Sequence, residues 1–550
     1  MLKEKRTGGI SVRKLPLRLV ALLLAVALTF SGCSFLEELY QNVMGSLNAG
    51  LFTAFDDMEY LRPDLEELSR LAQECADLSA QTDDAEKLMD AVYEFYYAYN
   101  GFYTNYALAD LHYCHDLTDI YWEQEYTFCM ENTAQADALL DQLLYTLAAC
   151  PLKEALEAEE YFGEGYFDGY AGESVWNEAF TALMEEESQL INQYYALSEK
   201  SLEEDTYSEA FFTGTGREMA ELYAQLVLVR QKIATEAGYP SYVDFAYDFY
   251  YYRDYTPQQA KAYTEQIAKE LVPIYRALDN NTDLHLNAGV FCSTSQTYSY
   301  VRDTANALGG TVLDAFLQLD SLGLYDIEHG ENKYNASYEV YLTNYSVPFV
   351  FMNPTMYTRD QLTFVHEFGH FCNDFASGGS VAGIDVAEVF SQGMEYLSLK
   401  CVEGREKLTK LKMADCLAVY VEQAAYASFE QQVYALAPEE VTADKIIDLF
   451  DAVGRQFGFD SWDFDKRDFV TITHFFTNPM YVISYVVSND AALQLYQMET
   501  EQAVKTLEDN LATEQAGFLA FLEEAGLESP FAPGRAESVK KLLQSILLDT

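Results

Sequence analysis

The stretch "TRDQLTFVHEFGHFCND", residues 358–374, contains two of the chain's seven histidines, four positions apart, with a glutamate directly after the first. Thr358 followed by Gln361 has the spacing of a capping box, and the "SGG" at 377–379 is typical of a helix end. The pattern therefore predicts one helix over residues 359–376, which would carry both histidines.

On such a helix His366 and His370 lie one turn apart on the same face, about 6 Å along the axis. That separation suits two imidazoles bound to one tetrahedral Zn²⁺ ion. Glu367 projects about 100° around the helix from His366, so it can stand beside the metal as a general base without being a ligand. The alternative is a structural pair of histidines that holds no metal.

A catalytic zinc site needs a third protein ligand and an open fourth position. The segment "GIDVAEVFSQGMEYLSLK" (383–400) predicts a second helix and places Glu388 18 residues after His370. Asp385 and Glu388 also have the spacing of a capping box, so Glu388 could cap this helix instead. Glu395 lies two turns further along the same face, where it could support a histidine ligand from behind.

Length and composition bound the class of protein. A chain of 550 residues can bury a large core in one or two lobes. Its net charge of −54 argues against nucleic-acid binding, because there is no excess of Lys and Arg to displace counterions from phosphates. Aromatic residues make up 15% of the chain and include 43 tyrosines, which argues against a disordered acidic chain.

Most of the chain has the period of amphipathic helices. In "DDAEKLMDAVYEFYYAYNG" (83–101), Asp83 with Glu86 predicts the start of a helix, and Asn100-Gly101 predicts its end. The aromatic run "YDFYYYRDY" (247–255) is interpreted as core and cleft wall.

The segment "SYEVYLTNYSVPFVFMNPT" (337–355) breaks the helical period, because apolar and polar residues alternate in its first half and an apolar run follows. That pattern predicts strands. Pro348 cannot donate to a sheet ladder, so its strand should lie at an edge or begin there. An exposed edge beside the histidine helix could pair with an extended peptide; a structural hairpin is the alternative.

The first 32 residues have the order of an export signal: a basic leader, the apolar run "LVALLLAVALTF" (19–30) and small residues. The run is too short for an ordinary membrane-spanning helix, which needs about 20 residues. Ser31-Gly32-Cys33 resembles a bacterial lipobox, so Cys33 is expected to be acylated and to anchor the protein to the outer face of a bacterial membrane. The alternative is an ordinary signal peptide cut nearby.

Three blocks together resemble the oligoendopeptidase F and thimet oligopeptidase family of zinc peptidases. They are "NPTMYTRDQLTFVHEFGH" (353–370), "AEVFSQGMEYL" (387–397) and "HFFTNPMYVISY" (474–485), and they occur in the family's order. The resemblance covers roughly residues 200–535. The chain departs from the family at Asn373, where relatives often have another histidine, and at Asn335-Ala336, where a glycine-alanine is common.

The resemblance implies a role for each site residue. One Zn²⁺ ion per chain would be held by His366, His370 and Glu388, with Glu367 as the general base. The third block would place a histidine and two tyrosines against the substrate carbonyl: His474, Tyr481 and Tyr485. The chain contains 43 tyrosines, so a packing role is the alternative for both Tyr481 and Tyr485.

The resemblance also implies the fold and the reaction. We expect a mainly α, two-lobed fold with a small β-sheet beside the zinc-site helix and a deep central channel. The expected division is a signal peptide (1–32), an N-terminal helical lobe (33–200) and a catalytic domain (201–550). The expected activity is hydrolysis of internal bonds in short unstructured peptides by a monomer. A surface lipoprotein that binds peptides with little turnover is the alternative.

Overall fold

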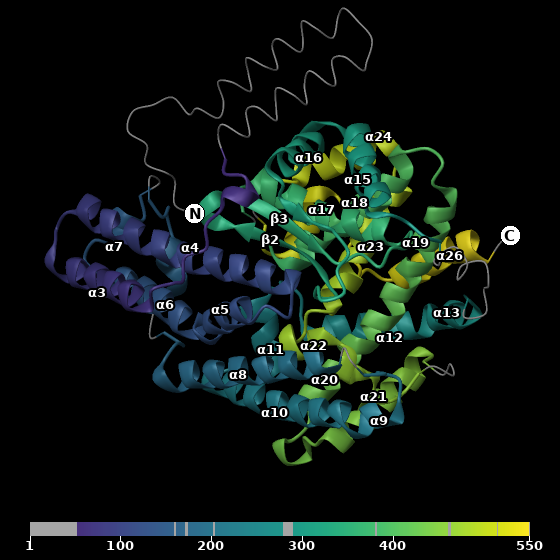
Figure 1. The fold of residues 1–550 in the computed structure, drawn as a ribbon, viewed down its shortest axis with the longest axis horizontal. Helices are drawn as coiled ribbons and strands as arrows, with labels where there is room; N and C mark the ends of the chain where they lie inside the picture. The colour runs from purple at the N-terminus through teal and green to yellow at the C-terminus, as the bar shows by residue number, and fades with distance from the viewer. Residues whose placement is uncertain are drawn as a thin grey trace, which may run out of the picture.

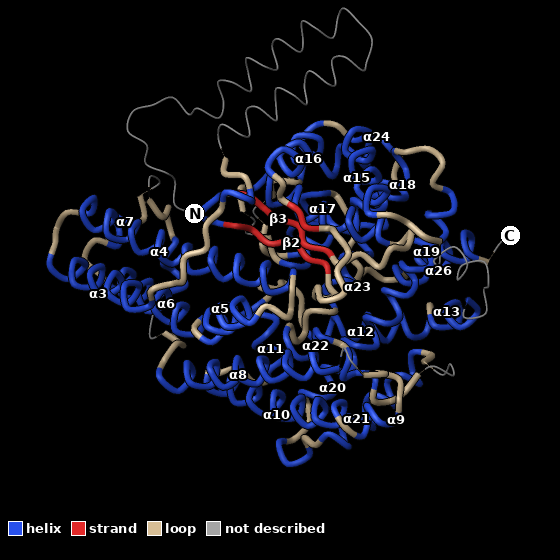
Figure 2. Tube along the Cα trace, in the orientation of Figure 1, coloured by secondary structure: helices blue, strands red, loops and turns tan. Residues whose placement is uncertain are grey.

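The computed structural model describes residues 52–158, 161–170, 174–201, 204–278, 290–379, 382–459, 464–513 and 515–548. Within these ranges the chain is mainly α-helical with one small sheet, as predicted (Figures 1 and 2). The predicted signal peptide and Cys33 lie outside the described residues.

The first group of helices gathers at one end of the molecule, at the left of Figure 1. Several of them form a separate core around Leu88, Val92 and Phe95. The helices are α3 (Leu65–Gln81), α4 (Ala85–His115), α5 (Ile120–Glu131), α6 (Thr133–Ala149) and α7 (Lys153–Leu156), followed by the long α8 (Glu178–Ser201). The predicted boundary between residues 200 and 201 falls at the end of α8, and the division into domains stays a prediction.

Helix α4 corrects two expectations. Its N-cap is Asp84, whose carboxylate accepts a hydrogen bond from the N–H of Lys87 at 3.2 Å, so the predicted start at Asp83 with Glu86 is wrong by one residue. The helix also continues through Asn100-Gly101 to its end at His115. The reason is tertiary: Phe102 and several later residues of α4 are buried, and the side chain of Asn344 packs close to Gly101.

The remaining helices pack around a second, larger core, to which parts of α4, α6 and α8 also contribute. Before the sheet they are α9 (Glu209–Thr213), α10 (Thr215–Glu236), α11 (Tyr242–Phe245), α12 (Pro257–Glu270), α13 (Val272–Leu278), α15 (Thr294–Leu308) and α16 (Gly310–Leu322). After it they are α17 (Asp360–Ser377), α18 (Ile384–Cys401), α19 (Glu406–Ala418), α20 (Ala424–Tyr434), α21 (Ala443–Phe457), α22 (Thr473–Thr477), α23 (Ile483–Gln497), α24 (Thr500–Asn510), α25 (Phe518–Ala525) and α26 (Arg535–Leu547). Helix α18 packs between α17 and α23.

The sheet contains β1 (Tyr325–Asp326), β2 (Ser337–Leu342) and β3 (Val347–Met352) in the order β1-β3-β2. β2 and β3 lie where strands were predicted and form an antiparallel pair between α4 and α17 (Figure 2). Pro348 is in the central strand, one residue after its start, and β1 pairs only with Val350 and Phe351. The proline therefore lies near the start of its strand, at a position that does not pair with β1 and so needs no backbone N–H toward it.

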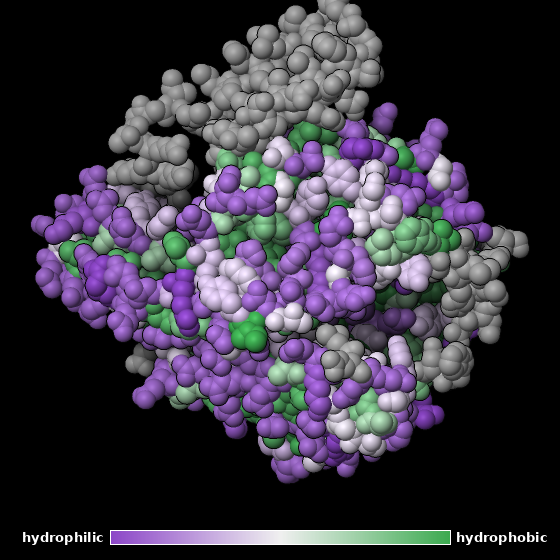
Figure 3. All heavy atoms as spheres, in the orientation of Figure 1, coloured by the Kyte–Doolittle hydropathy of each residue, from purple (hydrophilic) through white to green (hydrophobic). Residues whose placement is uncertain are grey.

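The surface agrees with the acidic composition. In the face shown in Figure 3, hydrophilic side chains predominate and hydrophobic ones are scattered. Among the described helices, none has both the length and the apolar character needed to cross a membrane. All eight cysteines of the described residues are free thiols, and six of them are buried.

Candidate active site

Helix α17 carries the two histidines of the motif and begins one residue later than predicted, at Asp360. The capping box is wrong, because the hydroxyl of Thr358 donates to the carbonyl of Val290 at 2.9 Å. The start of the helix is held instead by Asp360, whose carboxylate accepts a 2.7 Å hydrogen bond from the N–H of Met356. The local signal was therefore correct about the helix and wrong about its cap.

Three side-chain atoms converge beside α17. Oε2 of Glu388 lies 3.3 Å from Nε2 of His366 and 3.7 Å from Nε2 of His370. Tetrahedral zinc ligands at about 2.0–2.1 Å from the metal are separated by about 3.3–3.4 Å, so these atoms fit one Zn²⁺ ion. Glu388 does not cap its helix: the N-cap of α18 is Gly383, and Glu388 lies in the interior of α18 with 1% of its surface exposed.

A glycine between the two histidines brings the two helices together. A Cβ built on Gly369 would lie 2.6 Å from the Cα of Ser391 and 2.7 Å from the carbonyl oxygen of Phe390. Both are backbone atoms of α18, which cannot move aside without moving the helix. Gly369 therefore permits the close crossing that places Glu388 opposite the histidines.

Glu367 lies beside this group, with 6% of its surface exposed. One ring nitrogen of His366, one of His370 and one carboxylate oxygen of Glu367 all lie within 4.8 Å of one another. Burial raises the pKa of Glu367 to about 7, and Glu388 adds to this effect while His366 opposes it. A carboxyl group with such a pKa can both accept and return a proton near neutral pH.

Glu395 contacts the first histidine from behind. Its Oε1 lies 3.0 Å from Nδ1 of His366, while its Oε2 forms a 2.8 Å ion pair with the Nζ of Lys412. A carboxylate only accepts hydrogen bonds, so Nδ1 carries the proton and Nε2 faces Glu388. Lys412 was not singled out from the sequence, and no local pattern marks it.

The pKa shifts of the three converging groups differ in direction. Burial alone would raise the pKa of Glu388, but His370, His366 and the hydroxyl of Tyr481 lower it to about 2. Burial lowers the pKa of His370 to about 4, so this imidazole is neutral at pH 7. Burial would also lower the pKa of His366, but Glu388 and Glu395 outweigh it and raise the pKa well above its ordinary value.

The third sequence block reaches the same place from α22 and the start of α23. The hydroxyl of Tyr481 donates to Oε1 of Glu388 at 2.7 Å, and Nε2 of His474 lies 3.1 Å from the hydroxyl of Tyr485. The rings of Tyr481 and Tyr485 are 5.1 Å apart. Burial lowers the pKa of His474, so its imidazole is neutral. The structure thus brings together the predicted metal ligands, the predicted base and the predicted carbonyl-facing residues.

A cavity of about 1020 Å³ opens beside His474. Residues of β2 form one wall, and tyrosines from the N-terminal helices, including Tyr106, Tyr126 and Tyr195, form another. Asp110 and Glu199 are its charged residues, and within the described part of the chain no Lys or Arg lines it. The sequence did not identify this tyrosine wall, because its members come from separate helices.

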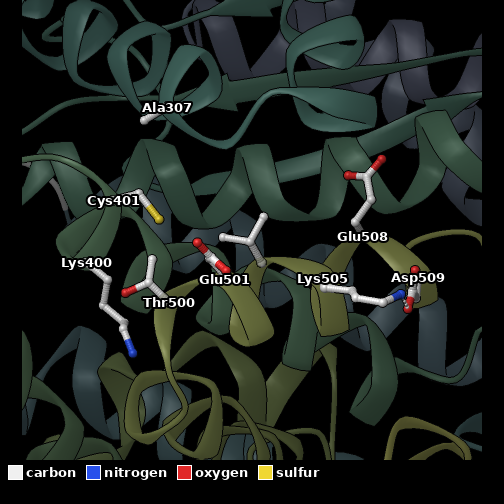
Figure 4. Close-up of a pocket in the computed structure, with 9 residues that line it drawn as sticks. Ala307, Lys400, Cys401, Thr500, Glu501, Lys505, Glu508 and Asp509 are labelled. Atoms are coloured by element: carbon white, nitrogen blue, oxygen red, sulfur yellow. Dashed lines mark hydrogen bonds and ion pairs between the residues drawn. The ribbon is translucent and has the colours of Figure 1, made fainter.

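A second hollow, of about 620 Å³, lies where α18 ends beside α24 (Figure 4). Lys505 and Asp509 in its wall form an ion pair with each other. None of the residues of the candidate active site lines this hollow, so it is separate from the site.

Comparison with known proteins agrees with this arrangement. Residues 190–513 match the model of peptidase family M3, and residues 55–171 match a peptidase M3 N-terminal domain. The first match spans more than half of the chain, so the chain belongs to peptidase family M3 and is a peptidase. A sequence comparison with curated proteins gave no match.

Solved structures share the fold. PZ peptidase A with an inhibitor aligns with a TM-score of 0.77 at 20% identity, over 89% of this chain and 99% of that one. A Bacillus anthracis protein assigned as an oligoendopeptidase F aligns with a TM-score of 0.74 at 20% identity, over 90% and 98%. Oligoendopeptidase F from Enterococcus faecium aligns with a TM-score of 0.59 at 13% identity, over 88% and 97%.

Proposed function

We propose that the protein is a zinc-dependent oligoendopeptidase that hydrolyses internal bonds of short, unstructured peptides. The observation that carries this proposal is the convergence of Oε2 of Glu388 with Nε2 of His366 and of His370, at 3.3 and 3.7 Å. These three side chains would hold the metal. When bound there, zinc would polarise the scissile carbonyl and lower the pKa of a water molecule.

The other residues of the site have separate roles in this reaction. Glu367 takes a proton from the attacking water and then delivers it to the leaving amine. Tyr485, with Tyr481 and the neutral His474 nearby, donates hydrogen bonds to the oxygen on which negative charge develops. Glu395 orients His366 through Nδ1.

The cavity beside His474 supports short peptides as substrates. The unpaired outer edge of β2 can pair with the backbone of an extended peptide, as in β-strand addition. A folded protein does not present such a strand within a cavity of about 1020 Å³. The two acidic residues in the wall favour neutral or basic peptides.

An N-terminal lipid on Cys33 would place this activity on the outer face of a bacterial membrane. The proposal rests on the sequence pattern of residues 1–33, which lie outside the described structure. Labelling of the expressed protein with a radioactive fatty acid tests it, with Cys33→Ser as the control. Equal labelling of both proteins would refute it.

Zinc content and peptide cleavage, measured together, test the main proposal. We expect one zinc per chain in the parent and in Glu367→Gln, and cleavage of an internally quenched peptide library by the parent alone. Zinc in both proteins with no cleavage in either would favour a peptide-binding lipoprotein. No zinc in either would overturn the metal site.

A further inference from the structure

The loop between α22 and α23, which carries Tyr481, has an unusual backbone conformation at Met480. Met480, directly before it, has φ +66° and is 3% exposed. This left-handed conformation is one that residues with a side chain rarely adopt, and it persists only where the surroundings hold it. Something must therefore hold the loop.

The peptide bond between Pro479 and Met480 is held at both ends. The hydroxyl of Tyr251 donates to the carbonyl oxygen of Pro479 at 2.8 Å. The N–H of Met480 donates to Oε1 of Glu430 at 2.8 Å. Since the two groups belong to one planar peptide unit, these contacts determine how that plane is turned.

Glu430 is fully buried, and its side chain is committed to the hydrogen bond with the N–H of Met480. It lies on α20 with 0% of its surface exposed, and its Oε2 has no hydrogen-bond partner among the described residues. Burying a carboxyl group is unfavourable unless it is well paired. Here its one hydrogen bond is to the residue that precedes Tyr481.

The orientation of that peptide unit decides where Tyr481 points. With Met480 in the left-handed conformation, the hydroxyl of Tyr481 reaches Oε1 of Glu388 at 2.7 Å. If φ of Met480 relaxed to the negative values that residues with a side chain prefer, with no compensating change at Pro479, the path of the chain into Tyr481 would change.

We propose that Glu430 and Tyr251 are positioning residues that clamp the Pro479–Met480 peptide and thereby aim Tyr481 at the reaction site. The inference rests on the proposed peptidase function. It assigns no contact with substrate to either residue: both act through Tyr481.

The first test is a kinetic cycle on the full-length, zinc-loaded protein. We expect Glu430→Met to lower kcat by about 10- to 100-fold with KM within about twofold, because a displaced Tyr481 no longer holds the carboxylate of Glu388 in place and a small misplacement in an active site costs this much. Glu430→Gln should keep the parental kcat, since its amide oxygen still accepts from Met480. Equal losses in the two variants would overturn the proposal.

The Tyr481→Phe background separates positioning from a general structural defect. If Glu430 acts through Tyr481, Glu430→Met has little further effect on kcat once the hydroxyl is absent. An undiminished loss in that background would overturn the proposal. If Glu430→Met does not fold, Tyr251→Phe removes the other half of the clamp and should show the same kcat loss and the same coupling.

Hydrogen exchange gives a readout that needs no catalysis. In zinc-free protein, the amide of Met480 should exchange faster in Glu430→Met than in the parent, and Glu430→Gln should behave as the parent. Equal protection in parent and Glu430→Met would overturn the clamp. If the parent cleaves no peptide, the proposed function fails, while this measurement still tests the clamp.

Discussion

The hydroxyl of Tyr481 donates a 2.7 Å hydrogen bond to Oε1 of Glu388, the carboxylate oxygen opposite the one that faces the two histidines. Oε1 of the proposed zinc ligand therefore accepts from Tyr481, while Oε2, which also accepts from the hydroxyl of Ser391 at 2.8 Å, faces the histidines. The contact links the third sequence block to the metal site through a carboxylate that is 1% exposed. Its loss would leave a buried polar atom unpaired.

Tyr481→Phe is accordingly expected to weaken zinc binding by about 10- to 100-fold, the usual cost of losing a partner of a ligand. Competition with a chromogenic chelator measures this affinity. Tyr485→Phe is the matched control, because that hydroxyl lies 3.1 Å from His474 and makes no contact with Glu388. Equal zinc affinities in the parent and Tyr481→Phe would contradict the prediction.

Tyr485→Phe should act on turnover instead. If its hydroxyl stabilises the developing oxyanion, kcat should fall by about 100- to 1,000-fold while KM changes little. Steady-state kinetics on a quenched peptide, at saturating zinc, provide the measurement. An unchanged kcat would show that this tyrosine only packs against its neighbours.

Gly369→Ala tests the helix crossing. The added Cβ would meet the backbone of α18 at 2.6 and 2.7 Å, so we expect a loss of about 1–3 kcal/mol in the free energy of unfolding and weaker zinc binding. Urea denaturation measures the first effect. Gly101→Ala, in the interior of α4, is the control: its nearest neighbour is a side-chain atom of Asn344 at 3.2 Å. Its effect on the free energy of unfolding should be smaller than that of Gly369→Ala, since alanine favours helix over glycine by about 1 kcal/mol and the neighbouring atom belongs to a side chain.

The stability of the protein should depend on pH through Glu430. Burial raises its pKa from 4.5 to about 8, with Met480 N–H, Arg230 and Arg253 opposing the effect. The folded protein thus binds this proton more tightly than the unfolded chain does. Its contribution to stability is full below pH 4.5 and is lost as the pH rises to about 8.

The comparison of parent and Glu430→Gln isolates this contribution. Between pH 4.5 and 8 the free energy of unfolding of the parent should fall by up to about 1.4 kcal/mol per pH unit relative to that of the variant. The variant cannot titrate at this position. Denaturation at several pH values in zinc-free protein tests it. Glu439→Gln, on an exposed glutamate, should track the parent. Parallel profiles for parent and Glu430→Gln would refute the prediction.

Net charge should affect substrate capture. With −54 on the chain and only acidic charges lining the cavity, a basic peptide should have a higher kcat/KM than an acidic peptide of equal length at low salt. The ratio should approach unity near 1 M salt, where the Debye length is about 3 Å. Equal rates for the two peptides at low ionic strength would contradict it.

Local patterns in the sequence determined the helices and strands around the site. The spacing of His366 and His370 places them on one face of a helix in any fold, because 3.6 residues make a turn. The alternation in residues 337–342 likewise predicted β2. Such signals act over one or two turns, which is why they failed at Asn100-Gly101, where burial of the next residues of α4 overrides the stop.

Only the tertiary structure decided which of its possible roles Glu388 plays. Sequence spacing allowed it to cap a helix or to face the histidines, and the close crossing of α17 and α18 at Gly369 selects the second. The contact of Glu430 with Met480 joins residues 50 positions apart and has no local signature. Such pairs meet only after the apolar faces of distant helices are buried together, a long-range effect that no short sequence window contains.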